Sequence, residues 1–306
     1  MPVHEPAIWL TFIILVGTLL VIDLGVLNRR SHVLAPREAL RWSGGVVVIS
    51  LLFGAFLWWR AGENTALEYY AGYLIELSLS VDNLFVFLLV FQYFAVPAEL
   101  QPRVLKWGIF GAILMRGIMI GLGAVLLQQF EWITWIFGGI LIITAVKMAR
   151  SGEERIEPEK NPLVRLARRL IPVTPAYENS HFFVRSLTQG WMATPLFLVL
   201  LVVEWSDVVF AVDSIPAVFA VTRDPFVVYA SNLFAILGLR ALFFVLAGAL
   251  DRFHYLRPGV ALILLFVGAK MLLGYWVHIA TDLSLVVILA ILTGAVGLSL
   301  LRPRTT

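Results

Sequence analysis

Long apolar stretches are the feature that most limits what this chain can fold into. A helix that crosses a bilayer needs about 20 mostly apolar residues, and about nine stretches reach that length or come close to it. They are apolar all round and do not alternate with a period of two, which excludes transmembrane strands. The stretches cover residues 7–27, 42–59, 70–95, 104–127, 132–149, 192–220, 226–248, 258–277 and 283–301. We therefore predict an all-α membrane protein with about nine transmembrane helices, in a single polytopic domain over residues 1–306.

The charged residues are few and unevenly placed. Only 14% of residues are charged and 60% are hydrophobic, compared with about 25% and 45–50% in soluble domains. Most Lys and Arg residues fall in the connections on one side of the predicted helices, whereas only Arg60 and Arg223 fall in those on the other side. The positive-inside rule then places the N-terminus outside and the C-terminus inside, with a long cytoplasmic loop at residues 150–190. The pI of 9.3 therefore reflects membrane orientation, and we expect no nucleic-acid partner.

A short helix is predicted inside the cytoplasmic loop. Asn161-Pro162 is typical of a helix start, because Asn caps the first turn and Pro is tolerated there. An apolar face and a basic face follow, with Leu163, Leu166, Ala167 and Leu170 on the first and Arg165, Arg168 and Arg169 on the second. This pattern suits a helix that lies on an anionic leaflet, and it equally suits a solvated loop helix.

The ionisable residues inside the predicted helices repeat in order. An Asp, an Arg and a Lys succeed one another at similar intervals twice, as Asp82, Arg116 and Lys147 and again as Asp207, Arg240 and Lys270. We interpret this as an internal repeat of two three-helix units, over about 70–149 and about 192–277. Because each unit has an odd number of helices, consecutive units enter the membrane from opposite sides. The repeat is therefore inverted, as in many secondary transporters whose substrate site lies near the midplane.

Five acidic residues lie within two of the predicted helices that correspond in this repeat. Each costs at least about 2.5–3.5 kcal/mol at the bilayer centre, so such residues indicate function. They are Glu76 and Asp82 in the third helix and Glu204, Asp207 and Asp213 in the sixth. We expect the two acidic centres to face each other, with Asn83 and Asn232 as further candidates.

The types of atom in this group indicate a metal ion. Pro216 has no N–H to donate to the Val212 carbonyl, so we expect a locally broken helix with a free carbonyl oxygen beside Asp213 and Ser214. Carboxylate, amide and carbonyl oxygens are hard ligands that suit Mg, Ca or Mn. The predicted metal ligands are Glu76, Asp82, Asn83, Glu204, Asp207, Asp213 and Asn232.

The intramembrane basic residues are predicted counter-ions to these acids. They are Arg116, Lys147, Arg240 and Lys270. Under the alternative, the charges only pair with one another and lock the helices, although buried pairs seldom stabilise a protein more than apolar isosteres do. The sequence has no cysteine, no H-E-x-x-H motif and no phosphate-binding loop, so we expect neither an enzyme nor a tightly bound cofactor.

Three runs of sequence carry a resemblance to a known family. They are Val81-Asp82-Asn83-Leu84-Phe85-Val86-Phe87, Glu204-x-x-Asp207-x-x-Phe210-Ala211-x-Asp213-Ser214-Ile215-Pro216-Ala217, and Ser231-Asn232-Leu233-Phe234-Ala235-Ile236-Leu237-Gly238-Leu239-Arg240. The chain resembles the TerC family from about residue 8 to residue 300. The resemblance implies a multi-pass protein of the bacterial inner (plasma) membrane that exports Mn(II) in metal homeostasis. It also implies that Glu76, Asp82, Asn83, Glu204, Asp207 and Asp213 line the ion path.

Two classes of function follow. The preferred hypothesis is a secondary transporter that exports a divalent cation, most favourably Mn(II), through an acidic midplane site between the third and sixth helices, with protons as the coupling ion. Its partners are then the lipid bilayer, the metal ion and protons. The residues by themselves are equally compatible with uptake. The alternative is a membrane-embedded redox or stress-response modulator or scaffold that transports nothing itself.

Overall fold

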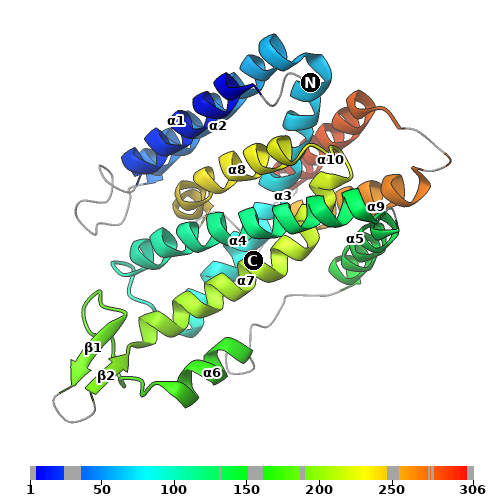
Figure 1. Cartoon of the computed structure of the whole chain (residues 1–306). Coiled ribbons are helices and arrows are strands. Elements are labelled where there is room, and N and C mark those ends of the chain that lie inside the picture. Colours follow the sequence, from blue (N-terminus) through cyan, green and yellow to red (C-terminus); the bar gives the residue numbers. More distant parts are fainter. Residues whose placement is uncertain are drawn as a thin grey trace.

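The structure, a computed structural model, describes residues 5–23, 36–130, 132–150, 161–186, 190–246, 255–274, 276 and 279–301. Within these ranges it does not describe the side chains of Asp82 and Arg240, so both predicted roles lie outside the described side chains. The elements, shown in Figure 1, are α1 (Pro6–Val21), α2 (Pro36–Ala61), α3 (Glu63–Tyr93), α4 (Gln101–Gln129), α5 (Ile133–Arg150), α6 (Pro162–Leu170), β1 (Phe183–Ser186), β2 (Gly190–Ala193), α7 (Pro195–Phe219), α8 (Pro225–Leu246), α9 (Leu256–Leu273) and α10 (Thr281–Leu301).

The architecture is that of an all-α membrane protein. Over the described residues, each predicted apolar stretch coincides mainly with one helix, from α1 to α5 and from α7 to α10. By length and composition, five described helices can cross a membrane: α2, α4, α5, α7 and α10. Shorter apolar segments lie on α1, α8 and α9. The acidic helix α3 packs against α2, α7, α8 and α10, so other helices shield much of it from lipid.

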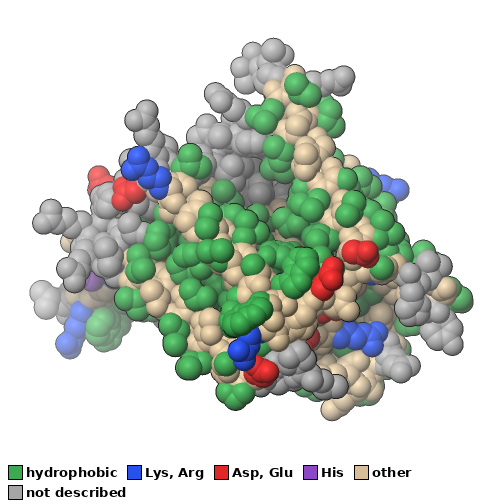
Figure 2. All heavy atoms as spheres, turned by 90° about the horizontal axis from the view of Figure 1, so that it is seen from above, with side chains coloured by type: hydrophobic (Ala, Val, Ile, Leu, Met, Phe, Trp, Pro, Cys, Tyr) green, Lys and Arg blue, Asp and Glu red, His purple; other side chains and the backbone are tan. Residues whose placement is uncertain are grey.

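The outer surface carries the apolar side chains that a bilayer requires. Hydrophobic side chains are spread over the face drawn in Figure 2, with a few charged side chains between them. Tryptophans collect near helix ends, where their rings suit the membrane–water boundary. Exposed examples are Trp58, Trp59, Trp132, Trp135 and Trp276, all at the ends predicted to be outside. They are therefore placed as an aromatic belt on that side would be.

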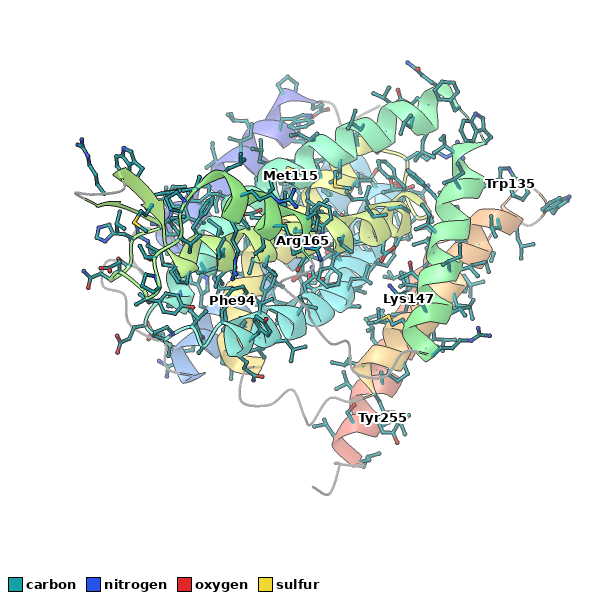
Figure 3. All side chains as sticks on the ribbon, turned by 90° about the horizontal axis from the view of Figure 1, so that it is seen from below. Phe94, Met115, Trp135, Lys147, Arg165 and Tyr255 are labelled. Atoms are coloured by element: carbon teal, nitrogen blue, oxygen red, sulfur yellow. The ribbon has the colours of Figure 1, made fainter. Side chains whose placement is uncertain are left out.

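Two groups of helices divide the interior. The helices α3, α4, α7 and α8 pack on one another in the middle of the molecule, while α5 and α9 form a closely packed pair beside them (Figures 1 and 3). The pair is tight because two glycines meet: a Cβ atom added at Gly268 would lie 3.1 Å from the Gly138 carbonyl oxygen. Small residues allow such close approach between membrane helices.

Helix α7 differs from the prediction at both ends. Its predicted start at residue 192 is wrong, because Gly190–Ala193 forms strand β2 and the helix begins at Pro195, whose missing N–H is harmless in a first turn. The predicted break near Pro216 is also wrong, because α7 continues to Phe219. Pro216 lies so near the end that the last turn still closes, with the Ala220 N–H donating to the Pro216 carbonyl at 3.0 Å.

The connection between α5 and α7 has structure of its own. The predicted short helix is confirmed as α6, and the Asn161 side chain accepts a hydrogen bond from the Leu163 N–H at 2.9 Å. Strands β1 and β2, which were not predicted, form an antiparallel hairpin directly before α7. The Tyr177 hydroxyl donates to the Phe94 carbonyl at 2.7 Å and so ties the connection to the end of α3. Partial burial raises the pKa of Tyr177 to about 12, so the hydroxyl keeps its proton and remains a donor.

Candidate functional site

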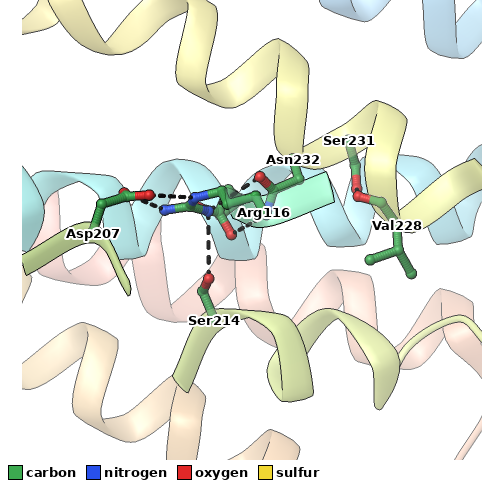
Figure 4. Close-up of polar contacts among 7 residues, drawn as sticks. Arg116, Asp207, Ser214, Val228, Ser231 and Asn232 are labelled. Atoms are coloured by element: carbon green, nitrogen blue, oxygen red, sulfur yellow. Dashed lines mark hydrogen bonds and ion pairs between the residues drawn. The ribbon is translucent and has the colours of Figure 1, made fainter. Parts of the chain in front are cut away.

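Arg116 lies at the centre of the candidate site. It is only 1% exposed, and its guanidinium contacts four side chains from three other helices (Figure 4). Nη2 and Nε donate to the two carboxylate oxygens of Asp207 at 3.1 and 3.3 Å. Nη1 donates to the carboxylate of Glu76, to Asn232 Oδ1 at 3.1 Å and to Ser214 Oγ at 3.4 Å. We call these five residues the Arg116 cluster.

The helices position the cluster by their buried faces. On α4 the buried residues recur every three or four positions, and Arg116 falls in the middle of that row. Asp207 and Ser214 are two turns apart on α7 and therefore share a face. Asn232 also donates through Nδ2 to Glu76 Oε2 at 3.0 Å, which links α8 to α3. The prediction that α3 and α7 bring their acidic residues together is therefore confirmed for Glu76 and Asp207.

The cluster is charged and dry. Glu76 and Asp207 are 0% and 3% exposed, so neither carboxylate has much access to water. With both carboxylates ionised, one guanidinium leaves a formal charge of −1. Removing these charges from water costs free energy. Ion pairing offsets that cost only when the geometry is good, as in the two-point contact between Arg116 and Asp207.

The other predicted acids on α7 do not join the cluster. Glu204 is half-buried one turn before Asp207, and its carboxylate lies so close to Gly111 of α4 that a Cβ atom there would overlap it. Asp213 Oδ1 instead accepts a hydrogen bond from Thr144 Oγ1 of α5 at 2.7 Å. The reason is helical geometry, because positions 207 and 213 lie on different faces of a continuous α7. Within the described residues, no three acidic or histidine side chains form a group that holds a metal ion.

Helix α3 extends the polar face beyond Glu76. Ser80 and Asn83 follow one and two turns later on the same face, and both are buried. Among the described residues, Ser80 Oγ and Asn83 Oδ1 have no hydrogen-bond partner. Four other helical serines donate to the carbonyl four residues back, as Ser78 does to Leu74. Ser80 was not predicted, although its spacing from Glu76 would have identified it.

Two of the predicted counter-ions lie elsewhere. Lys147 is exposed on α5, well along the helix from Trp135 (Figure 3). Lys270 of α9 donates to Ser284 Oγ of α10 at 2.8 Å. Neither side chain contacts the Arg116 cluster, and their role as counter-ions to the other midplane acids stays a prediction. Among the predicted basic residues whose side chains are described, Arg116 alone enters the cluster.

The hydroxyl groups were the hardest to predict. Thr144, Ser214 and Ser231 are buried or half-buried hydroxyl residues in transmembrane helices. Ser231 donates to the Val228 carbonyl of its own helix (Figure 4), whereas Ser214 turns to Arg116. Serine and threonine are common in membrane helices and usually bond to the backbone. Ser214 was expected beside Asp213 because of the nearby Pro216, but the sequence carried no such signal for Thr144.

The fold and this charged core define a polytopic integral membrane protein, and comparison with known proteins identifies its family. The model of the integral membrane protein TerC family matches residues 61–306, so the chain belongs to the TerC family. An uncharacterized membrane protein of Myxococcus xanthus is 48% identical, over 99% of this chain and 94% of the relative. The Escherichia coli K12 protein named "Putative membrane-bound redox modulator Alx" is 49% identical, over 95% of this chain and 93% of the relative. The predicted resemblance to the TerC family is thus confirmed, and proteins named Alx are among the similar relatives.

The likeness extends to more distant relatives. An uncharacterized membrane protein of Rickettsia bellii is 40% identical over 96% of this chain and 97% of the relative. No solved structure matches this chain. These relatives are named as membrane proteins, and the similarity covers nearly their whole length.

Proposed function

We propose that this protein is a secondary transporter of the bacterial inner membrane that exports a divalent cation, with Mn(II) as its main substrate, through the Arg116 cluster. One observation carries the proposal. Carboxylate, hydroxyl and amide oxygens from α3, α7 and α8 converge on one buried position, which a cationic guanidinium fills. These oxygens are hard ligands of the kind that Mn(II), Mg(II) and Ca(II) prefer.

Arg116 acts in this proposal as a tethered cation that competes with the substrate. The guanidinium and a divalent ion need the same oxygens of Glu76 and Asp207. When Arg116 moves away and a divalent ion replaces it, the two ionised carboxylates are neutralised. When Arg116 stays, the addition of a divalent ion gives an excess positive charge in a dry site, which is costly. Substrate binding therefore requires Arg116 to leave its partners.

The same charge arithmetic supports coupling to protons. With Arg116 in place, the cluster becomes neutral if one carboxylate binds a proton. Exchange of that proton and the guanidinium for a divalent ion then keeps the site neutral in both states. Export moves two charges outward against an inside-negative potential, at about 4.6 kcal/mol per 100 mV, so an inward proton flux supplies a suitable driving force.

The remaining predicted residues belong to the proposed ion path beside the cluster. Asp82 and Asn83 lie on α3 beyond Glu76, and Glu204 and Asp213 flank Asp207 on α7. An inverted repeat would let α3 exchange roles with α7 and α4 with α8. The packing of α3 on α8 and of α4 on α7 supports that symmetry, as does the contact between α5 and α9.

Transport in proteoliposomes tests the proposal. We expect Mn(II) flux driven by an imposed pH gradient in the native protein, and loss of most of that flux in Glu76→Gln and Asp207→Asn. The matched controls are Glu63→Gln, an exposed acid on the same helix as Glu76, and Asp282→Asn, an exposed acid on α10. Competition by Mg(II), Ca(II) and Zn(II) measures selectivity, and vesicles of opposite orientation separate export from uptake. Equal flux in the site variants and the controls would contradict the proposal.

A second candidate is a redox or stress-response modulator or scaffold without transport of its own. It is supported by the name of the Alx relatives. Because the sequence has no cysteine, thiol exchange would have to be provided by a partner. This candidate predicts that Asp207→Asn disturbs assembly with co-purifying proteins and leaves cellular Mn(II) unchanged. The transporter hypothesis predicts raised cellular Mn(II) with no change in assembly, and in neither case an enzymatic step.

A further inference from the structure

A second unit of the protein has exposed features that transport does not explain. It consists of residues 161–186 and 190–193, and we call it the α6–hairpin unit. Helix α6 packs against α7, with Val164 and Ala167 buried in the same apolar cluster as Leu196 and Val199. Because α7 begins at Pro195, directly after β2, the unit is held at one end of a transmembrane helix. It therefore lies at a boundary of the bilayer.

Helix α6 has three different sides. Val164 and Ala167 form the side that packs on the protein. Leu166 and Leu170 lie on a second side and are 53% and 71% exposed. A third side carries Arg165, Arg168 and Arg169. In a loop helix surrounded by water, the exposed apolar side with Leu166 and Leu170 would have no function. A helix at a membrane surface uses it to enter the lipid, and uses the arginine side to contact headgroups.

The hairpin continues the apolar and basic surfaces. Arg185 of β1 is paired with Trp191 of β2, and paired residues of an antiparallel ladder share a face. Phe183 lies on that face too, two residues from Arg185. All three side chains are exposed. The backbone is braced on the other edge of β2, where the Thr174 N–H donates to the Ala193 carbonyl at 2.8 Å.

An open groove lies between α6 and the hairpin. It is apolar, with a volume of 420 Å³, and it is lined by Leu170, Ile171, Pro172, Phe183 and Trp191. Small-molecule sites have volumes of about 300–1,000 Å³. The described residues of the unit include four arginines and one glutamate, Glu178. The surface thus combines an apolar groove with an excess of positive charge.

We propose that the α6–hairpin unit binds an anionic phospholipid, with an acyl chain in the groove and the headgroup phosphate on Arg168, Arg169 and Arg185. Arginine suits phosphate because its guanidinium donates two parallel hydrogen bonds. Tryptophan at the edge of the groove suits the boundary between headgroups and acyl chains. A lipid fits better than a soluble acidic protein, because the packing of α6 on α7 holds the exposed apolar side at the membrane. The positive-inside prediction puts this lipid in the cytoplasmic leaflet, which is the anionic one.

Thermal unfolding of the purified full chain in detergent, with EDTA present, tests this proposal independently of transport. We expect phosphatidylglycerol to raise Tm and phosphatidylcholine to raise it much less. Loss of Arg168, Arg169 and Arg185 as a triple Gln variant should weaken phosphatidylglycerol binding about a hundredfold, since each basic residue near an anionic surface contributes about fivefold. The matched control is Arg223→Gln, an exposed arginine in the turn between α7 and α8.

Three further measurements make the test decisive. The triple Lys variant keeps the charge and should retain most of the preference, which separates lost charge from lost folding. Leu170→Ser should weaken binding while leaving the arginines in place. Glycerol phosphate alone should not raise Tm, because it lacks the acyl chains. The proposal is overturned if glycerol phosphate matches the lipid, or if the triple Gln variant responds to phosphatidylglycerol as the native protein does.

Discussion

The Arg116 cluster and the α5–α9 pair contain the same kind of residue in opposite surroundings. Arg116 and Lys147 are both basic residues in transmembrane helices of the first predicted repeat unit. Arg116 is buried and contacts four polar side chains, whereas Lys147 is exposed. In the cluster, ion pairs join α3, α4 and α7, and hydrogen bonds with Asn232 add α8. In the pair, the close approach of Gly138 and Gly268 joins two helices. An ionisable residue in an apolar stretch therefore indicates a site only when its helix is enclosed by others.

Removal of Arg116 should have the largest effect. Arg116→Gln leaves the carboxylates of Glu76 and Asp207 buried without their cation, and breaking a buried ion pair in this way costs about 3–5 kcal/mol. We expect that loss in the free energy of unfolding in mixed detergent micelles. Lys147→Gln, the matched change in the other region, should alter stability by less than about 0.5 kcal/mol. Similar losses in the two variants would remove the distinction between the regions.

A double-mutant cycle sharpens the comparison. Combining Arg116→Gln with Asp207→Asn should give a coupling energy of about 1–3 kcal/mol, because the two side chains form a two-point contact. The same cycle with Lys147→Gln and Asp207→Asn should give less than about 0.5 kcal/mol. Additive effects in the first cycle would show that Arg116 and Asp207 act independently.

The stability of the α5–α9 pair should depend on the size of the side chains at its contact and not on their charge. Gly268→Ala places a methyl group 3.0 Å from Leu141 Cβ and 3.1 Å from the Gly138 carbonyl, and this crowding should cost about 1–3 kcal/mol. Gly139→Ala is the control, because a Cβ atom there meets nothing within 4 Å. Unfolding of both variants measures the difference, and an equal stability would mean that the close contact does not hold the pair together.

The smallest predicted effect concerns the bond between the two regions. Thr144→Val removes the hydrogen bond from α5 to Asp213 and should cost about 1 kcal/mol. Thr144→Ser keeps the hydroxyl and should recover most of that stability. If the Val and Ser variants unfold alike, the hydroxyl does not stabilise the contact between α5 and α7.

The sequence predicted the helices better than their ends. Helix length and apolar composition are local properties, so α1 to α5 and α7 to α10 were all expected, as was α6 with its Asn161 cap. The hairpin before α7 escaped prediction because its two four-residue strands lie beside a long apolar helix. The effect of Pro216 was overestimated, since a proline in the last turn removes one hydrogen bond without ending the helix.

For the candidate site, too, some residues could be predicted from the sequence and others could not. Glu76, Asp207 and Arg116 could be identified from the sequence because a charged side chain in the middle of a membrane helix has a high free-energy cost and requires a partner. Asn232 also lies where it was expected, but Glu204 and Asp213 do not contact Arg116. Asp213, six positions after Asp207, lies on a different face of α7. Glu204, one turn before Asp207, lies against Gly111 of α4, so only the neighbouring helices decide which acids meet Arg116.

By itself, the sequence determined that this chain is a helical membrane protein and which ionisable residues lie within its apolar stretches, while its orientation in the membrane stays a prediction. These properties depend on the composition of short segments and on the free energy of transfer into lipid. Only the tertiary structure decided that Arg116 joins Glu76 and Asp207 while Lys147 and Lys270 lie apart from them. The physical reason is that ion pairs and hydrogen bonds act over a few ångströms, so the packing of distant helices selects which charges meet.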